Sequence, residues 1–367
     1  MQSNDNQAGS NCSCSSGCCG SAPAFPILKA PYIKGLNVTI AGAVPRVATE
    51  LTKKDVLGAW KVRWGIGRMD YKIAPGLYSV GRPDADSPVL VTANYKLTFD
   101  SLRKELAQLD LWILVLDTKG VNVWCAAGKG TFGTDELVRR IGAVRLSEVV
   151  HHKTLILPQL GATGVAAHEV SRRCGFHVVY GPVREHDINA FLAAGMNATP
   201  EMREVRFTMA DRLVLTPVDF VQWLKPLLIF YGALFILNAL GLGRFGGTEI
   251  VAFLGAAVTG CVLTPILLPW IPGRAFAFKG ACMGLLWAVA VVLLSGGVAQ
   301  SGVLKSLSYL LLLPSISAYA AMNFTGSSTY TSPSGVHKEM RVAIPIMLLA
   351  SVGGVALLFV GGILQAL

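Results

Sequence analysis

The chain has 367 residues, of which 52% are hydrophobic and 15% are charged, and its mean hydropathy is +0.51. These values exceed those of ordinary soluble proteins and exclude a wholly soluble chain. Residues 1–216 contain 25 Lys/Arg and 19 Asp/Glu, whereas residues 217–367 contain 7 and 3, so we expect a soluble domain followed by a membrane domain. The net charge of +10 is spread thinly. It favours a basic surface beside an anionic membrane leaflet, and no nucleic-acid partner is predicted.

Four of the eight cysteines lie in a polar N-terminal stretch, and they are Cys12, Cys14, Cys18 and Cys19. Residues 1–43 are predicted to form a flexible tail and lead-in. The first residues lack the apolar region of a signal peptide, so we expect a cytoplasmic domain with reduced thiols. The spacing of the four cysteines matches neither zinc-finger nor ferredoxin patterns. Two interpretations remain: capture of a soft metal ion, or a variable tail with incidental cysteines.

Between residues 44 and 216, short apolar runs alternate with helical segments. Strands are predicted at 71–80 (strand or hairpin), 89–92, 111–116, 154–157 and 177–180, and helices at 51–64, 99–109, 135–141, 162–174 and 185–194. Asp100 or Ser101 is expected to cap the second helix, and residues 204–209 to be extended. The alternation predicts a parallel sheet covered on both faces, with ligands bound at the carboxyl ends of the strands. Three loops follow strands there, at residues 117–132, 158–163 and 181–184.

Five later segments have the length and apolarity of membrane spans. They lie at roughly 218–241, 247–269, 277–297, 303–322 and 342–364. No charged residue lies deep within them, which argues against ion or proton transport. The loops after the second and fourth segments are the more basic ones, so the positive-inside rule places the N-terminal domain in the cytoplasm.

The stretch NVWCAAGKGTF, residues 122–132, follows the apolar strand at 111–116. Its Cys125 permits three interpretations: a buried structural cysteine, a nucleophilic thiol activated by a helix N-terminus and Lys129, or an axial thiolate ligand of a macrocyclic metal. The small residues beside Cys125 favour the third, because a planar ring needs a wall without bulky side chains.

A P-loop is excluded by spacing. The motif G-x-x-x-x-G-K-[ST] needs a glycine where Val123 stands and a Ser or Thr where Gly130 stands, so nucleotide hydrolysis is not predicted.

The stretch NVWCAAGKGTF resembles the signature of the mercury-methylating corrinoid proteins. It is also similar to the corrinoid-binding region of the corrinoid iron–sulfur proteins of the acetyl-CoA pathway. A second stretch, LILPQLGATGVAAHEV at residues 155–170, resembles another block of the same domain. The resemblance covers roughly residues 45–215, and the five apolar segments match the mercury-methylating architecture.

The resemblance implies a Rossmann-like corrinoid-binding α/β domain at residues 44–216, followed by an all-α transmembrane domain of five helices at residues 217–367. The cofactor would be a cobalamin-type corrinoid in the base-off state. Cys125 would supply the lower axial ligand of cobalt as a thiolate, since the D-x-H-x-x-G motif of histidine-ligated corrinoid enzymes is absent. The surrounding residues would shape that face, and they are Asn122, Val123, Trp124, Ala126, Ala127, Gly128, Lys129, Gly130 and Thr131. The other two loops would contact the corrin and its tail through Pro158, Gln159, Leu160, Gly161, Ala162, Gly181 and Pro182.

The implied activity is that of a methyltransferase that passes a methyl group from methylcobalt(III) to Hg(II) and forms methylmercury. The methyl group would come from methyltetrahydrofolate or its methyltransferase. The N-terminal cysteines do not reproduce the cluster domain of the iron–sulfur proteins, so a ferredoxin-like partner with two 4Fe-4S clusters would supply electrons. Those cysteines would instead be candidates for Hg(II) capture. The expected location is the cytoplasmic (inner) membrane of an anaerobic bacterium or archaeon.

Two alternatives stay open. One is a corrinoid methyl carrier of one-carbon metabolism, and the other is a non-catalytic membrane sensor with a ligand-binding cytosolic domain.

Overall fold

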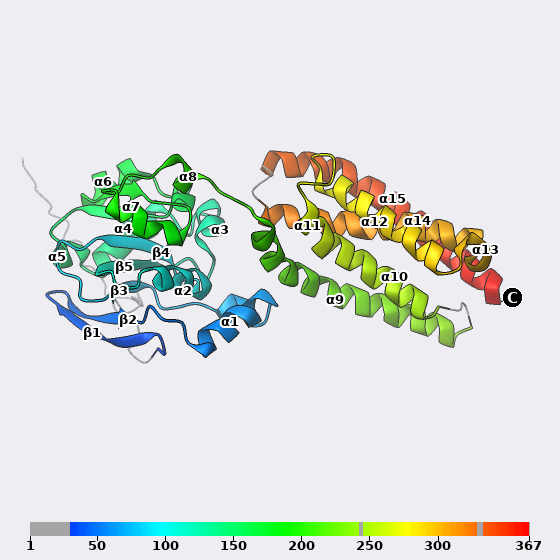
Figure 1. Cartoon of the computed structure of the whole chain (residues 1–367), viewed down its shortest axis with the longest axis horizontal. Helices are drawn as coiled ribbons and strands as arrows, with labels where there is room; N and C mark the ends of the chain where they lie inside the picture. The colour runs from blue at the N-terminus through cyan, green and yellow to red at the C-terminus, as the bar shows by residue number, and fades with distance from the viewer. Residues whose placement is uncertain (1–29, 242–244, 329–332, 367) are drawn as a thin grey trace, which may run out of the picture. The chain divides into compact units, whose positions relative to one another are not determined.

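A computed structural model describes residues 30–241, 245–328 and 333–366. The chain divides into two compact units, which are described separately (Figure 1). The sheet unit comprises the described residues up to Glu50 together with Lys72–Ala198. The helical unit comprises Leu51–Tyr71 and the described residues from Thr199 onwards. Residues 51–71 therefore group with the long helices, although they lie inside the range 44–216 that was predicted as one domain.

The sheet unit is built on a seven-stranded mixed sheet with the order β1-β2-β3-β5-β4-β6-β7. The strands are β1 (Ile33–Thr39), β2 (Gly42–Val47), β3 (Gly76–Val80), β4 (Val89–Ala93), β5 (Leu111–Leu116), β6 (Thr154–Leu157) and β7 (His177–Tyr180). Strands β5, β4, β6 and β7 run parallel to one another. The strands predicted from continuous apolar runs are confirmed, because every residue of β4 and β5 is buried.

The predicted parallel sheet is confirmed for β5, β4, β6 and β7, but the sheet as a whole is mixed. Strand β3 runs antiparallel to β5, and β1 runs antiparallel to β2. The physical reason is the length of the connection after β3. Residues 81–88 are too few for the crossover of a dozen or more residues that parallel strands require.

The strand pair β1–β2 was not predicted. Its residues lie partly within the range assigned to a flexible lead-in, yet β1 pairs with β2 from Ile33↔Val47 to Thr39↔Gly42. β1 alternates between half-buried and exposed positions, as expected for a strand at the edge of a sheet. Gly35, Asn37 and Pro45 weaken the apolar signal of this pair.

Helices connect the parallel strands and follow the last of them. They are α2 (Lys96–Glu105), α3 (Val123–Gly128), α4 (Thr134–Ala143), α5 (Leu146–Val149), α6 (Ala167–Cys174) and α7 (Ile188–Ala193), with 3₁₀ turns η2 (Gln159–Gly161) and η3 (Glu185–Asp187). The predicted cap of α2 is wrong, because this helix begins earlier, after Tyr95. Asp100 instead lies inside the helix, where its carboxylate pairs with Lys96 at 2.5 Å and with Arg103 at 2.8 Å. The predicted helix at 162–174 likewise begins later, at Ala167.

The helical unit contains five helices that are long and apolar enough to cross a membrane, which confirms their predicted number. These candidate spans are Met209–Ala239, Gly247–Leu267, Phe276–Leu294, Val303–Gly326 and Ser334–Leu364. The constituent helices are α9 (Met209–Ala239), α10 (Gly247–Val258), α11 (Thr264–Leu267), α12 (Phe276–Leu294), α13 (Gly297–Ser301), α14 (Val303–Asn323) and α15 (Pro333–Ala366). A π-helical turn, Thr259–Leu263, joins α10 to α11. The unit also contains α1 (Lys53–Arg63), the 3₁₀ turn η1 (Arg68–Asp70) and α8 (Pro200–Arg203). Residues 204–208, predicted to be extended, have no regular structure.

A charged pair joins two of these helices. Glu249, in the first turn of α10, is 1% exposed and lies 2.5 Å from the Lys305 ammonium in the first turn of α14. The Tyr309 hydroxyl donates a hydrogen bond of 2.8 Å to the same carboxylate. A buried carboxylate is tolerated when it is paired and hydrogen-bonded. The ion pair therefore links α10 to α14 near their N-termini.

Candidate functional site

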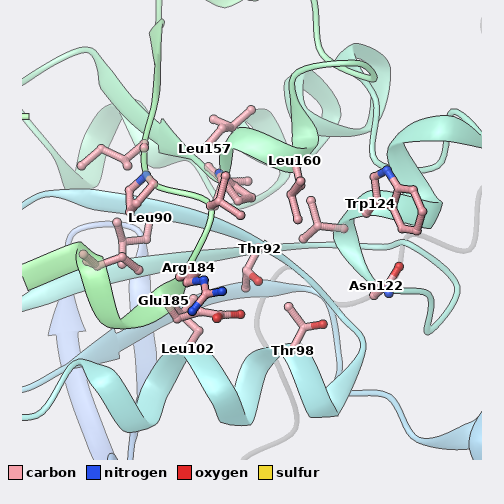
Figure 2. Close-up of a pocket in the computed structure, with 18 residues that line it drawn as sticks. Leu90, Thr92, Thr98, Leu102, Asn122, Trp124, Leu157, Leu160, Arg184 and Glu185 are labelled. Atoms are coloured by element: carbon pink, nitrogen blue, oxygen red, sulfur yellow. The ribbon is translucent and has the colours of Figure 1, made fainter. Parts of the chain in front are cut away.

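The candidate site lies where the direction of strand addition reverses. From β4 the chain proceeds to β5 on one side, and from β6 it proceeds to β7 on the other. Strands β4 and β6 pair only through Leu90↔Ile156, so no ladder joins them closer to their carboxyl ends. A crevice at such a reversal is the usual ligand site of open α/β sheets. A cavity of about 200 Å³ lies there (Figure 2).

The three loops predicted to bind a ligand meet at this cavity. The first contributes Asn122, Val123 and Trp124, the second Pro158 and Leu160, and the third Gly181 and Pro182. Strand β4 and helix α2 complete the wall with mainly apolar side chains, including Leu90 and Leu102 (Figure 2). The volume is below the range of about 300–1,000 Å³ that is usual for ligand pockets, so the cavity suits part of a large cofactor rather than all of it.

The cavity has a polar side near β7. Arg184 and Glu185 line it, and Thr92 and Thr98 lie nearby (Figure 2). Burial raises the pKa of the Glu185 carboxyl above its ordinary value, and the charge of Glu105 raises it further. Arg184 is the last residue of the third predicted loop, whereas Thr92, Thr98 and Glu185 were not predicted, although Glu185 directly follows that loop.

Helix α3 is short and has well-formed ends. The Asn122 side chain caps its N-terminus by accepting a hydrogen bond of 3.0 Å from the backbone N–H of Cys125. At its C-terminus Gly130 adopts a left-handed conformation, with φ of 79°. The Gly130 N–H bonds to Ala127 O at 3.2 Å and the Thr131 N–H to Ala126 O at 2.9 Å, which is the Schellman pattern. Gly130 thus has a structural role in ending the helix.

Helix α3 has one buried face and one open face. Val123, Ala126 and Ala127 are buried in the core of the sheet unit. Trp124 is 39% exposed, Gly128 and Lys129 are also exposed, and Cys125 is a free, half-buried cysteine. The space around Gly128 is open, because a Cβ built there meets no atom within 4 Å. A flat group can therefore approach the backbone here.

The two stretches that carried the family resemblance pack against each other. Phe132 is fully buried, and a Cβ on Gly161 would lie 2.6 Å from its ring. A Cβ on Gly164 would lie 2.1 Å from Phe132 O and 2.9 Å from Ala127 Cα. These glycines are needed for the loop after β6 to reach α3. Gly161 is buried, and its predicted contact with a cofactor would involve its backbone only.

The loop after β6 holds an unsatisfied acceptor. Gln159 Oε1 is buried and has no hydrogen-bond partner within the described part of the chain. Ala162, the last residue predicted in this loop, is half-buried, and its N–H bonds to Gln159 O at 3.1 Å. A buried acceptor without a partner costs free energy, so a ligand donor at Gln159 would be favourable.

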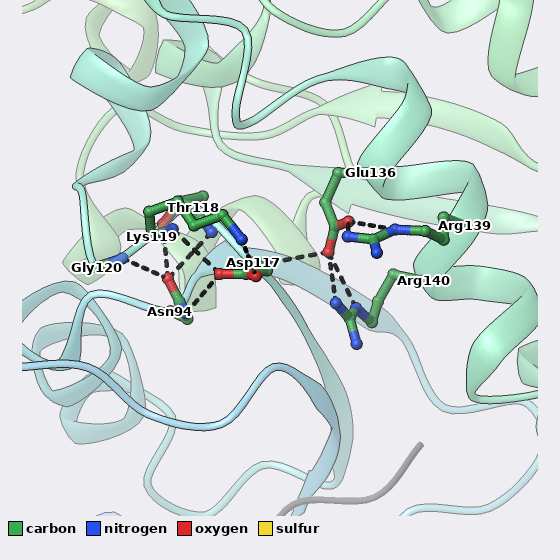
Figure 3. A network of polar contacts seen from close by, with 8 residues as sticks. All are labelled: Asn94, Asp117, Thr118, Lys119, Gly120, Glu136, Arg139 and Arg140. Carbon is green, nitrogen blue, oxygen red and sulfur yellow. Dashed lines mark hydrogen bonds and ion pairs between the residues drawn. The ribbon is translucent and has the colours of Figure 1, made fainter. Parts of the chain in front are cut away.

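A polar network that the sequence analysis missed fixes the loop between β5 and α3 (Figure 3). Asn94, directly after β4, is buried, and its Oδ1 accepts hydrogen bonds of 3.0 Å from the backbone N–H groups of Thr118 and Gly120. Its Nδ2 donates to Asp117 Oδ1 at 3.1 Å. Burial by itself raises the pKa of Asp117, but hydrogen bonds and charge from Lys119 outweigh it and lower the pKa. The only available signal was a polar residue at the end of a strand.

A second cluster ties α4 to the same loop. Glu136, in the first turn of α4, accepts a hydrogen bond of 2.9 Å from the backbone N–H of Asp117 (Figure 3). It also pairs with Arg139 and, at 2.7 Å, with the buried Arg140. The two clusters together hold the loop that precedes α3.

The N-terminal cysteines predicted as candidates for Hg(II) capture, Cys12, Cys14, Cys18 and Cys19, lie outside the described residues. Within the described ranges, no group of three or more His, Cys, Asp or Glu side chains is arranged to hold a metal ion. Cys125, the predicted cobalt ligand, lies on α3 directly after Asn122, Val123 and Trp124, which line the cavity, but is not itself among the lining residues.

Comparisons with known proteins match the sheet unit. A family model described as the CO dehydrogenase/acetyl-CoA synthase delta subunit matches residues 66–192. The chain is 32% identical over 127 residues to the acetyl-CoA decarbonylase/synthase complex subunit gamma of Methanopyrus kandleri, covering 34% of this chain and 27% of the relative. The same subunit of Archaeoglobus fulgidus is 29% identical over 127 residues, with coverage of 34% and 27%. That of Methanosarcina acetivorans is 31% identical over 120 residues, with coverage of 32% and 25%.

The chain spans about a quarter of the length of the curated relatives it matches. The matched segment includes β3 to β7 and α3 with Cys125, and it ends before the long helices. The comparisons support the relationship to the corrinoid proteins of the acetyl-CoA pathway. They do not extend it to the mercury-methylating proteins.

Proposed function

We propose that the chain is a membrane-anchored, corrinoid-dependent methyltransferase with Cys125 as the lower ligand of cobalt. The observation that carries the proposal is the open face of α3, on which Trp124, Cys125 and Gly128 lie, together with the cavity at the reversal point of the sheet, which Trp124 also lines. The similarity to acetyl-CoA pathway subunits over residues 66–192 supports the same cofactor class.

The residues fit such a group. A corrin ring is flat and carries amide side chains, and the open space at Gly128 would admit its edge. The cavity is too small for the whole group, so α3 would hold the ring and residues that line the cavity, such as Leu160 and Pro182, would hold the tail.

The bound corrinoid would supply the cobalt that accepts and donates the methyl group. The chain itself would orient and tune this cofactor. The Cys125 thiolate would occupy the lower axial position, and the Asn122 cap would hold the backbone on which the thiolate is carried. The exposed ammonium of Lys129 would form an ion pair with a phosphate of the cofactor tail or with the Cys125 thiolate.

The proposal also specifies which molecule accepts the methyl group. The stretch NVWCAAGKGTF and the five candidate spans favour Hg(II) as the methyl acceptor, with a two-cluster ferredoxin-like partner as the reductant. The similarity to acetyl-CoA decarbonylase/synthase subunits favours a second candidate, a methyl carrier of one-carbon metabolism. The family match covers residues 66–192, most of which lie in the sheet unit, and it ends before the long helices.

The test uses the full chain in detergent or lipid, with Cys125→Ala and the matched control Cys174→Ala, a half-buried cysteine on α6. Wild type and control are expected to bind hydroxocobalamin with the same visible spectrum, whereas Cys125→Ala is expected to lose the thiolate-ligated spectrum. Cells are then assayed for methylmercury. If the wild type shows no corrinoid spectrum, both corrinoid functions are excluded and the non-catalytic sensor is the remaining alternative. A corrinoid spectrum without methylmercury would favour the one-carbon carrier.

A further inference from the structure

Helix α1 and the turn that follows it present an exposed apolar surface that the proposed function does not use. Five of its apolar side chains are exposed, and they are Val56, Leu57, Trp60, Ile66 and Met69. Trp60 is 56% exposed and Met69 72%. We call these five residues the α1–η1 surface. Contiguous exposed apolar side chains usually mark a site of interaction.

The surface lies on one side of an amphipathic helix. Val56, Leu57 and Trp60 share one face of α1 by their spacing, whereas Asp55 and Val62 on the other face are 6% and 2% exposed. The α1–η1 surface is therefore the side of this segment that the protein itself leaves uncovered.

The charge around the surface is basic. Residues 53–70 contain five basic side chains, and they are Lys53, Lys54, Lys61, Arg63 and Arg68, against the exposed Asp70 and one further acidic residue. That acidic residue, Asp55, is buried and accepts hydrogen bonds from the N–H of Thr52 at 2.9 Å and its hydroxyl at 2.8 Å. The charge presented outwards is thus positive, which requires an anionic partner.

The segment is continuous with the membrane helices. α1 groups with the helical unit and packs against α9, the first candidate span. A Cβ built on Gly65 would lie 3.8 Å from Val221 of α9. Trp60 and Trp64 have ring centroids 5.8 Å apart. Tryptophan side chains next to basic residues are typical of segments that lie in the headgroup layer of a bilayer.

We propose that the α1–η1 surface docks onto an anionic phospholipid surface, with its apolar side chains inserted between the headgroups and its lysines beside their phosphates. Charge complementarity and continuity with α9 favour the bilayer crossed by the helical unit over a soluble partner. The segment would then be an interfacial element of the membrane unit rather than part of the soluble domain.

The test measures amide hydrogen exchange of residues 53–69 in the full chain, reconstituted in nanodiscs of phosphatidylcholine or of phosphatidylcholine mixed with phosphatidylglycerol. Each lysine near an anionic surface strengthens binding by about fivefold, so exchange of this segment should slow by about tenfold or more with phosphatidylglycerol. The variant Lys53→Gln/Lys54→Gln/Lys61→Gln should lose this effect, and high salt should weaken it.

The matched control, Lys34→Gln/Lys104→Gln/Lys153→Gln, removes the same charge from exposed lysines of the sheet unit and should keep the wild-type response. Trp60→Gln tests the apolar part of the surface and should reduce protection in both lipid mixtures. Exchange that is equal with and without phosphatidylglycerol in the wild type would overturn the proposal. If the control variant loses as much protection as the variant of Lys53, Lys54 and Lys61, the proposal is also overturned, because the effect would then come from net charge and not from the α1–η1 surface.

Discussion

The substitution Gly128→Ala separates the demands of the fold from those of the cofactor. Gly128 is the last residue of α3, and a Cβ there meets no protein atom within 4 Å. Without a cofactor the added methyl group should therefore stabilise the helix, by up to about 0.5–1 kcal/mol. With a corrin ring lying against the α3 backbone, the same methyl group would occupy the ring's place. Overpacking of this kind costs about 1–3 kcal/mol, which corresponds to roughly 5- to 150-fold weaker binding.

The assay titrates the full-length protein with hydroxocobalamin and follows the visible absorption, alongside thermal unfolding without the cofactor. Gly142→Ala is the matched control, because Gly142 lies in α4, is exposed and also has open space at its Cβ. Both variants should unfold at or slightly above the wild-type temperature, and only Gly128→Ala should bind corrinoid more weakly. Wild-type affinity in Gly128→Ala would refute the placement of the ring on α3.

Three further results are expected. Asn122→Ala removes the cap that accepts from the Cys125 N–H, so α3 should lose about 1 kcal/mol and the Cys125 amide should exchange faster, whereas Asn122→Asp should retain the cap. Glu136→Gln leaves the buried Arg140 without its carboxylate, and the free energy of unfolding should fall by about 3–5 kcal/mol. The pKa of Glu185 is higher in the folded state than in the unfolded state. The stability that Glu185 contributes is therefore fully present at low pH, and it is lost as the pH rises from about 4.3 through the raised pKa. Glu185→Gln should remove this part of the pH dependence of the unfolding midpoint.

Each of these results has an outcome that would contradict it. Unchanged amide exchange in Asn122→Ala would mean that the cap does not hold α3. A loss in Glu136→Gln no larger than in Glu148→Gln, which breaks an exposed pair with Arg145, would remove the buried cluster as the cause. An identical pH profile in Glu185→Gln would show that another group titrates.

The parallel strands were predictable because burial on both faces makes each of them a continuous apolar run, as in LWILVL of β5. The direction of β3 was not evident from its own residues, since apolar runs carry no direction, and only the length of residues 81–88 encoded it. Strand β1 was missed because an edge strand needs no continuous apolar run, and Gly35 in β1 and Pro45 in β2 further obscured the pattern of the pair.

The three loops of the candidate site were found because carboxyl ends of neighbouring parallel strands must meet. The hydrogen-bond network around Asn94 could not be predicted, because Asn94 and Gly120 are far apart in the sequence and come together only in the folded chain. Asp100 was misassigned for a similar reason. An aspartate near the start of a helix can either cap the helix or form an ion pair within it, and the structure shows an ion pair with Arg103.

The division of the chain into two units has a consequence for constructing fragments. The polypeptide passes from one unit to the other three times, after Glu50, Tyr71 and Ala198. A contiguous fragment that spans the whole sheet therefore carries α1 without α9, the helix that α1 packs against. A self-contained soluble fragment should instead join Glu50 to Lys72 through a flexible linker and stop at Ala198, which keeps all seven strands and Cys125.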